Sequence, residues 1–316
     1  ASAVNLPACT KHWANSTGGD WAVAGNWSPA GIPGWNAVVC LDAAGTYTVT
    51  VVGPKLVNAI VVGGGAANAT LSYTNGGVLT TWNVTTGIQV KAGSTLKWID
   101  PVNLTTGFMQ VDGTWRADFP GGVAVVYADS IRNGGTIDVN RAELKPVVGA
   151  FHNAGTLKVT GPAAKLTIVG TAFGLISMEG GTVSGQGTVV ATTTIPPPLP
   201  PPVSYFPPTF SWTAGTIPAR LSGPGARLKV IGVPIYLGAT TLQGVVELET
   251  VYLSVSTLGL IWATPVTTIA GSLPAGAQLD LTGNGQAILP HSNLGVITVS
   301  PVDSMTLWFA DVSLNL

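Results

Sequence analysis

Residues 113–139 read GTWRADFPGGVAVVYADSIRNGGTIDV, and one short motif both opens and closes this stretch. The motif is a glycine, a small residue, an apolar residue, a polar residue and a second apolar residue. It recurs, complete or slightly altered, at residues 45–49, 93–98, 113–117, 135–139, 155–159, 181–184, 225–230 and 276–281. From residue 93 to residue 155, successive motifs begin 20 to 22 residues apart. That spacing is typical of one coil of a β-helix.

Aligning the motifs produces columns of residues that share one character. Two columns are apolar, and a polar column runs between them. The first apolar column holds Leu96, Trp115, Ile137, Leu157 and Val183, the second holds Trp98, Ala117, Val139 and Val159, and the polar one holds Lys97, Arg116, Asp138, Lys158 and Ser184. A solenoid stacks equivalent residues about 4.8 Å apart, and alternate columns face inward and outward. The pattern predicts an all-β parallel β-helix whose polar column faces solvent. A β-sandwich or jelly roll, with similar strands and turns, is the alternative.

Glycine-rich pieces precede several motifs, namely Asn133-Gly-Gly, Asn153-Ala-Gly and Glu179-Gly-Gly. Glycine and asparagine tolerate a positive φ better than other residues do. We therefore expect these pieces to adopt positive φ where the chain turns a corner between two faces of the coil.

The composition excludes several classes of partner. The chain of 316 residues has 13 basic and 14 acidic residues and a net charge of −1, so it has no electrostatic footprint for nucleic acid. No run of about 18 apolar residues is free of Gly, Pro, Ser and Thr, so no membrane span is expected. Two cysteines and three scattered histidines do not form a zinc-binding set, and neither a metal nor a cofactor is expected.

The cysteines and the N-x-S/T triplets point to a secreted protein at the cell surface or outside the cell. Cys9 and Cys40 flank a segment rich in Trp and Gly, and a disulfide between them would contribute about 3–4 kcal/mol outside a reducing cytosol. If the source glycosylates such triplets, the N-terminal third carries sugars, and otherwise these are turn asparagines. The five candidate asparagines are Asn15, Asn26, Asn68, Asn83 and Asn103.

The predicted organisation has four parts. Residues 1–44 form a disulfide-bonded cap in which Trp13, Trp21, Trp27 and Trp35 cover the first coil, and residues 45–194 form the solenoid. Residues 195–209 are rich in proline, which cannot donate to a strand ladder, so they form a loop or a linker. Residues 210–316 continue the solenoid or form a second β domain.

Several segments resemble secreted β-helix proteins of the adhesin and autotransporter-passenger type. They are GDWAVAGNWSPAGIP at 19–33, GTYTVTV at 45–51, NGGTI at 133–137, GGTVSGQG at 180–187 and FSWTAGTI at 210–217. The resemblance covers about residues 19–230. It implies a right-handed parallel β-helix on a cell surface or in an extracellular matrix. The paired cysteines and the proline segment depart from that pattern.

An enzyme is disfavoured, although many β-helices degrade polysaccharides with clustered carboxylates. In the alignment, Asp138 stacks beside Arg116, and Asp118 stacks beside Asn140. This arrangement predicts salt-bridge and polar ladders, and no catalytic residue is assigned. A lyase or hydrolase using Asp112, Asp118, Asp129 or Asp138 is the least favoured interpretation.

The C-terminal segment 305–316 suggests how the protein works. It reads MTLWFADVSLNL, an apolar strand with one charge. Such a strand can pair with the N-terminal region of a second copy, and repetition of that contact gives a filament. The sequence predicts an extracellular structural protein, a self-assembling filament or surface-layer subunit. A monomeric adhesin or carbohydrate-binding module is the alternative. The predicted assembly residues are Met305, Leu307, Trp308, Phe309, Val312, Leu314 and Leu316.

Overall fold

The computed structural model describes residues 6–77, 79–179, 182–185 and 187–193, and beyond residue 208 it describes strands alone. The chain forms two units. The first is built from the described residues up to Val147 together with Gly155–Lys158. The second is built from Val148–Ala154 and the described residues from Val159 onward.

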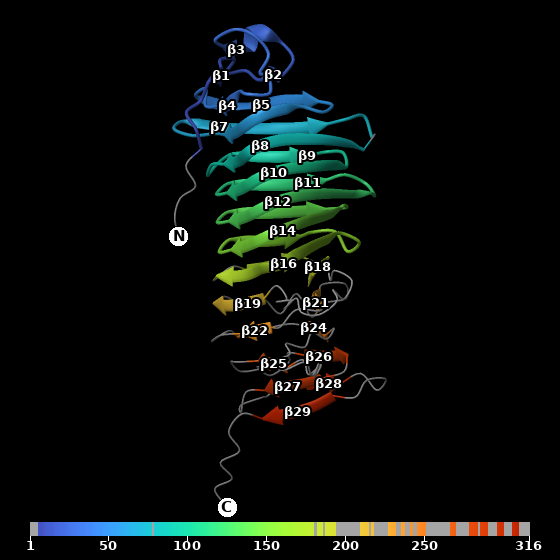
Figure 1. The fold of residues 1–316 in the computed structure, drawn as a ribbon. Helices are drawn as coiled ribbons and strands as arrows, with labels where there is room; N and C mark the ends of the chain where they lie inside the picture. Colours follow the sequence, from blue (N-terminus) through green and yellow to red (C-terminus); the bar gives the residue numbers. More distant parts are fainter. Residues whose placement is uncertain are drawn as a thin grey trace, which may run out of the picture. The chain divides into compact units, whose positions relative to one another are not determined.

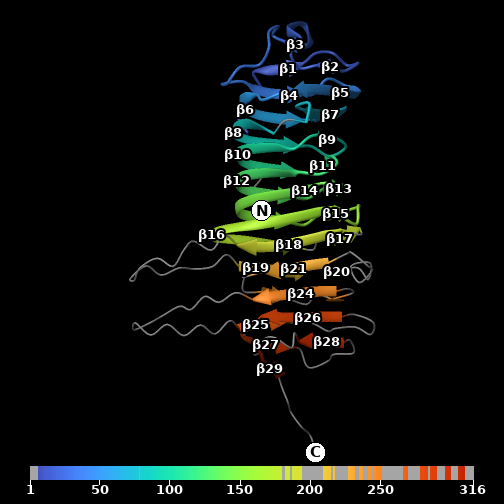
Figure 2. The same cartoon turned by 90° about the vertical axis from the view of Figure 1, so that its right-hand side faces the viewer.

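Two ladders of parallel strands make up the first unit (Figures 1 and 2). Longer strands pair in the order β4, β6, β8, β10, β12 and form what we call the long ladder. Shorter strands pair in the order β2, β5, β7, β9, β11, β13 and form the short ladder. The long ladder comprises β4 (Val38–Leu41), β6 (Leu56–Val62), β8 (Thr80–Val90), β10 (Val102–Val111) and β12 (Val123–Asn133). The short ladder comprises β2 (Gly19–Asp20), β5 (Gly45–Val52), β7 (Ala67–Thr74), β9 (Thr95–Trp98), β11 (Thr114–Asp118) and β13 (Thr136–Asn140).

The pairing register reproduces the predicted columns. Trp115 pairs with Leu96 on one side and Ile137 on the other, and all three side chains are fully buried. Asn103 pairs with Val125, 22 residues further along the chain, so one coil is close to the predicted length. The prediction of a β-solenoid is confirmed, and the sandwich alternative is wrong because its sheets would not stack successive coils in parallel register.

Among the members of the polar column whose burial the structure describes, Asp138 departs from the prediction. Arg116 pairs with Lys97 and Asp138, as the alignment requires. Asp138, however, is only 7% exposed and does not face solvent freely. The long Arg116 side chain reaches across from the neighbouring coil and places its Nη1 atom 3.8 Å from an Asp138 carboxylate oxygen. Stacking of a long cation beside a short acid therefore shields the acid from water.

The expected role of the glycine-rich pieces is wrong for the two that the structure describes, at residues 133–135 and 153–155, whereas Gly180 and Gly181 lie outside the described residues. Asn133, Gly135 and Gly155 do not have positive φ. Glycine is needed there because successive coils touch through their backbones: a Cβ atom on Gly135 would lie 2.1 Å from the Gly113 carbonyl oxygen, and one on Gly155 would lie 2.2 Å from the Gly135 oxygen. Positive φ occurs at other corners, such as Gly93 and Gly121.

In the long strands, the alternation of buried and outward side chains shifts by one residue at a bend. In β10 the buried side chains alternate through Leu104 and Thr106, and the next buried one is Met109. The register with β8 shifts between Thr106 and Phe108. Such a β-bulge bends the strand and re-aims the residues beyond it. Gly107 lies in the bend, where a Cβ atom would approach the Thr86 carbonyl oxygen to 2.6 Å.

The second unit also consists of parallel ladders. Within it β16 pairs with β18 and β19, and the pairings continue through β21, β24, β26 and β28 on one side and β22, β25, β27 and β29 on the other. Residues 195–208 of the predicted proline-rich loop lie outside the described residues.

The strands that follow β13 along the chain are β14 (Glu143–Asn153), β15 (Thr156–Val159), β16 (Lys165–Glu179), β17 (Thr182–Gly185), β18 (Thr188–Thr193), β19 (Thr209–Ala214), β20 (Thr216–Ile217), β21 (Arg227–Ile231), β22 (Ile235–Leu237), β23 (Thr241–Leu242), β24 (Val245–Thr250), β25 (Val266–Ile269), β26 (Gln278–Gly283), β27 (Gly285–Leu289), β28 (Val296–Val299) and β29 (Met305–Phe309).

Candidate functional site

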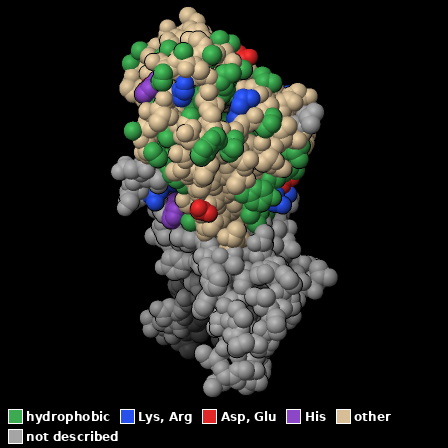
Figure 3. Space-filling model, turned by 45° about the horizontal axis from the view of Figure 1, so that its top comes forward, with side chains coloured by type: hydrophobic (Ala, Val, Ile, Leu, Met, Phe, Trp, Pro, Cys, Tyr) green, Lys and Arg blue, Asp and Glu red, His purple; other side chains and the backbone are tan. Residues whose placement is uncertain are grey.

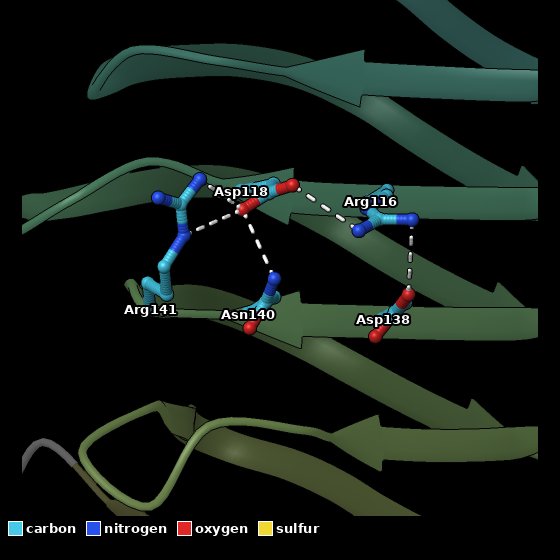
Figure 4. Close-up of polar contacts among 5 residues, drawn as sticks. All are labelled: Arg116, Asp118, Asp138, Asn140 and Arg141. Atoms are coloured by element: carbon cyan, nitrogen blue, oxygen red, sulfur yellow. Dashed lines mark hydrogen bonds and ion pairs between the residues drawn. The ribbon is translucent and has the colours of Figure 1, made fainter.

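A polar cluster on the outer face of the short ladder is the first candidate site (Figure 4). Strand β11 contributes Arg116 and Asp118, strand β13 contributes Asp138 and Asn140, and Arg141 follows β13 directly. The parallel register sets Arg116 opposite Asp138 and Asp118 opposite Asn140. Side chains from two successive coils therefore meet on one surface.

Asp118 is the centre of this cluster. Its Oδ1 atom accepts hydrogen bonds from Arg141 Nε at 3.0 Å, Arg141 Nη2 at 2.7 Å and Asn140 Nδ2 at 3.1 Å. Its Oδ2 atom accepts a hydrogen bond from Arg116 Nη2 at 3.1 Å. Both carboxylate oxygens are thus engaged by cationic or amide donors.

The electrostatics of the cluster do not suit acid–base catalysis. Burial by itself would raise the pKa of the Asp118 carboxyl, but the hydrogen bonds and charges of Arg141 and Arg116 outweigh it and lower that pKa. A glycosidase needs one carboxyl with a raised pKa that can donate a proton. Arg116 lies between Asp118 and Asp138 and pairs with both. The cluster is suited to tying two coils together.

Replacing Asp118 with asparagine should destabilise the first unit by about 1–3 kcal/mol near neutral pH, because two guanidinium groups lose their charged acceptor. A lowered folded-state pKa adds stability above the unfolded carboxyl pKa, and that stability is lost as the pH falls through the folded value. The difference in the free energy of unfolding between the variant and the native protein should therefore shrink in acid. Urea unfolding at about pH 7 and about pH 2 measures it, with the exposed Asp129→Asn as the matched control. A difference that stays constant down to the lower pH would contradict this assignment.

Arg141 has a φ of 60°, the one positive φ outside glycine among the described residues. A side chain in this left-handed region costs roughly 1–2 kcal/mol. The two hydrogen bonds to Asp118 offset that cost, and the conformation directs the guanidinium back over β11. No sequence signal marks this turn, because arginine is not a usual residue at a left-handed position.

The N-terminal segment brings together its two cysteines and three of its tryptophans. Cys9 and Cys40 form a disulfide with their Cα atoms 5.9 Å apart. Trp27 meets Trp13 and Trp21 edge to face, with ring centroids 4.9 and 4.7 Å apart, and all three side chains are buried. Strand β1 (Lys11–Trp13) pairs with β3 (Trp27–Ser28) and with β4, so these rings lie against the first coil of the long ladder.

Trp35 does not join this cluster, contrary to the prediction. Its side chain is 71% exposed. Ile32 is 51% and Val23 is 50% exposed on the same short segment of the cap. A backbone hydrogen bond from Gly31 to Ala24 brings the neighbours of Ile32 and Val23 together. We give the name cap patch to Val23, Ile32 and Trp35, which are the exposed large apolar residues of the described part of the cap.

The five predicted glycosylation asparagines fall into two groups. Asn15 Nδ2 donates to the Gly18 carbonyl oxygen at 2.7 Å and to Asn26 Oδ1 at 3.1 Å, and Asn26 Nδ2 donates to the Asp20 carbonyl oxygen at 3.0 Å. These two amides hold the cap together. The other three lie on outward positions of strands: Asn68 and Asn83 are exposed and Asn103 is partly exposed.

The predicted assembly residues lie in two regions. Met305, Leu307, Trp308 and Phe309 belong to β29, which pairs in parallel with β27, Leu307 opposite Ala287. Val312, Leu314 and Leu316 lie outside the described residues. The assembly role of this segment stays a prediction.

Asp100 is a structural residue that sequence reasoning missed. It follows β9 and accepts hydrogen bonds from Thr74 Oγ1 at 2.6 Å, Asn75 N at 2.8 Å and Gly76 N at 3.1 Å. Burial would raise the pKa of its carboxyl, but these donors prevail and lower it. The Thr-Asn-Gly-Gly run at 74–77, one coil earlier, was the available signal, because such turns present several N–H groups together.

Neither a metal centre nor a known relative identifies the site. Within the part of the chain that the structure describes, no three His, Cys, Asp or Glu side chains gather as a metal site requires. The same residues contain no helix long and apolar enough to cross a membrane. No protein-family model, curated protein or solved structure matched the chain.

Proposed function

We propose that this protein is an extracellular structural subunit whose copies join end to end into filaments or a surface layer. The observation that carries the proposal is the cap patch. Solenoid ends normally need a polar outer face to keep the molecule soluble and monomeric. This chain instead has a 71% exposed tryptophan with exposed isoleucine and valine in its cap. Solvent exposure of such a side chain is unfavourable, and a partner that covers it gains that free energy.

The proposed occupant of the cap patch is the C-terminal region of a second copy, which contains the apolar strand β29. Contact between two different surfaces of identical subunits repeats head to tail, and it produces a filament when the rotation between successive subunits does not close into a ring. Two of the cap's short strands, β2 and β3, are only two residues long, β1 is three residues long, and Pro29 follows β3. Short edges next to proline offer little backbone for strand addition. Side-chain packing on the cap patch therefore has to supply most of the proposed contact.

Two further observations support an extracellular structural role. The disulfide between Cys9 and Cys40 persists in oxidising compartments and is rare in the cytosol. Charged side chains are sparse on the face of the described residues that Figure 3 presents, where uncharged and hydrophobic groups dominate. Only 9% of the whole chain is charged. Few like charges then oppose the close approach of many copies.

Replacing Trp35 with aspartate should raise the concentration needed for assembly about tenfold or more, because a buried interface tryptophan is typically a dominant binding residue. The substitution should leave the fold intact, since the side chain is already exposed. Sedimentation of the assembled fraction over a range of protein concentrations measures the effect.

The matched control is Val52→Asp, an equally drastic change at a 54% exposed residue outside the cap. Loss of assembly in Trp35→Asp and its retention in Val52→Asp supports the end-to-end contact. Equal assembly of both variants and the native protein would contradict it. A native protein that never sediments would leave a monomeric adhesin as the better account.

A further inference from the structure

One face of the long ladder brings two glycosylation triplets and an exposed aromatic ring together. On β8, β10 and β12 the residues before the bend alternate between buried and outward positions. Asn83 and Thr105 are exposed outward residues, and Asn103 is partly exposed on the same side. Tyr127 points outward from β12 and is 49% exposed, although tyrosine is large and largely apolar.

The register places these residues as close neighbours. Asn83 pairs with Thr105, and Thr105 pairs with Tyr127, so the three form one column across three coils. Asn103 pairs with Val125, two residues before Tyr127. With strands about 4.8 Å apart and a rise of about 3.3 Å per residue, the Cα atoms of Asn103 and Tyr127 are about 8 Å apart. Side chains at such diagonal positions reach one another when one is aromatic.

The chemistry of the three residues is complementary. Asn83-Val-Thr85 and Asn103-Leu-Thr105 are both acceptor triplets for an N-linked sugar. A pyranose ring has one face lined by C–H groups, and that face packs on an aromatic ring while the hydroxyl groups stay in water. Thr105 has a small side chain between Asn83 and Tyr127, so it leaves room for a sugar above it. An exposed tyrosine here gains a partner without any change in the fold.

We propose that Asn83 and Asn103 are N-glycosylated and that the Tyr127 ring is the platform on which the first sugar of the Asn103 glycan packs. The inference rests on the proposed extracellular role, because N-linked sugars are added to secreted chains. Glycans on this face would also block side-by-side contact between the long ladders of two copies, which leaves the cap patch and the C-terminal strand for assembly.

The test uses the full chain secreted from cells that attach N-linked glycans, with each glycan trimmed enzymatically to one N-acetylglucosamine. Mass spectrometry of peptides first reports occupancy at Asn83 and Asn103. Thermal unfolding then compares native protein, Tyr127→Ala, Asn103→Gln and the double variant. Asn68→Gln is the control, since it removes the triplet on β7 of the other ladder.

We expect both asparagines to be occupied and Tyr127→Ala to lower the unfolding midpoint by about 2–4 °C more when the Asn103 sugar is present than when Asn103→Gln has removed it. The same excess should persist in the Asn68→Gln background. Unoccupied asparagines, or occupied ones with additive effects of the two substitutions, would overturn the inference. Electron micrographs of the same samples keep the two proposals apart, since filaments without this coupling would refute the glycan platform alone.

Discussion

Gly135→Ala should destabilise the first unit by about 3 kcal/mol or more, a large effect for the addition of one methyl group. The new Cβ atom would lie 2.1 Å from the Gly113 carbonyl oxygen and 2.6 Å from the Asp112 oxygen. Both obstacles are backbone atoms of the preceding coil, so no rotamer change can remove the clash. The coils would have to separate and lengthen their hydrogen bonds. Urea unfolding followed by tryptophan fluorescence measures the loss.

Gly134→Ala is the matched control for this substitution. It adds the same methyl group at the neighbouring residue, where the nearest atom would be an Asp112 carboxylate oxygen at 3.4 Å. That contact is ordinary, and neither glycine has a positive φ. We expect the control to change stability by less than about 1 kcal/mol. Equal effects of the two substitutions would mean that close backbone approach does not explain the glycines of the motif.

Removing the disulfide with Cys9→Ser and Cys40→Ser together should cost about 3–4 kcal/mol, the chain-entropy value for a loop of this length. The two residues are 31 positions apart, and the bond ties the start of the cap to β4. Without it, β1 should separate from β4 and expose the buried Trp13 and Trp27. Hydrogen exchange of residues 6–44 should rise more than that of β7 to β13.

Reduction of the native protein provides a second version of the same experiment. Dithiothreitol should raise exchange in the cap as the double substitution does, and reoxidation should reverse it. A cap that stays protected after reduction would show that the tryptophan cluster and the β1 pairing suffice without the bond. The predicted cost would then be wrong.

The sequence was sufficient to predict the coil because stacking imposes a strict rule on it. Trp115 and Ile137 must follow Leu96 at coil spacing in order to share one buried column, and the two-residue alternation fixes which residues lie between them. The same rule predicts Asp118 beside Asn140 and Arg116 beside Asp138, and both pairs occur in the ladder. A disulfide between Cys9 and Cys40 was predictable because the only two cysteines of the chain flank a segment rich in Trp and Gly.

Other features depend on contacts that the motif does not encode. In the sequence, the glycines of the motif look like turn residues. They are needed because the backbones of two successive coils approach each other closely there, and a sequence does not show that distance. The bend at Gly107 interrupts the alternation inside a strand of ten residues, so a simple period of two fails there. Tryptophan is usually a buried residue, and only the packing around Trp35 in the folded cap leaves its side chain exposed. The cap patch could therefore not be predicted from the sequence.

The most direct test of the account is electron microscopy of the native, untreated protein at its source concentration. End-to-end assembly predicts long, regular fibres with an axial repeat close to the length of one subunit. Those fibres should disappear with Trp35→Asp and persist with Val52→Asp. Dispersed single particles in the native sample, at every concentration that the source reaches, would contradict the central proposal that this chain is a structural subunit.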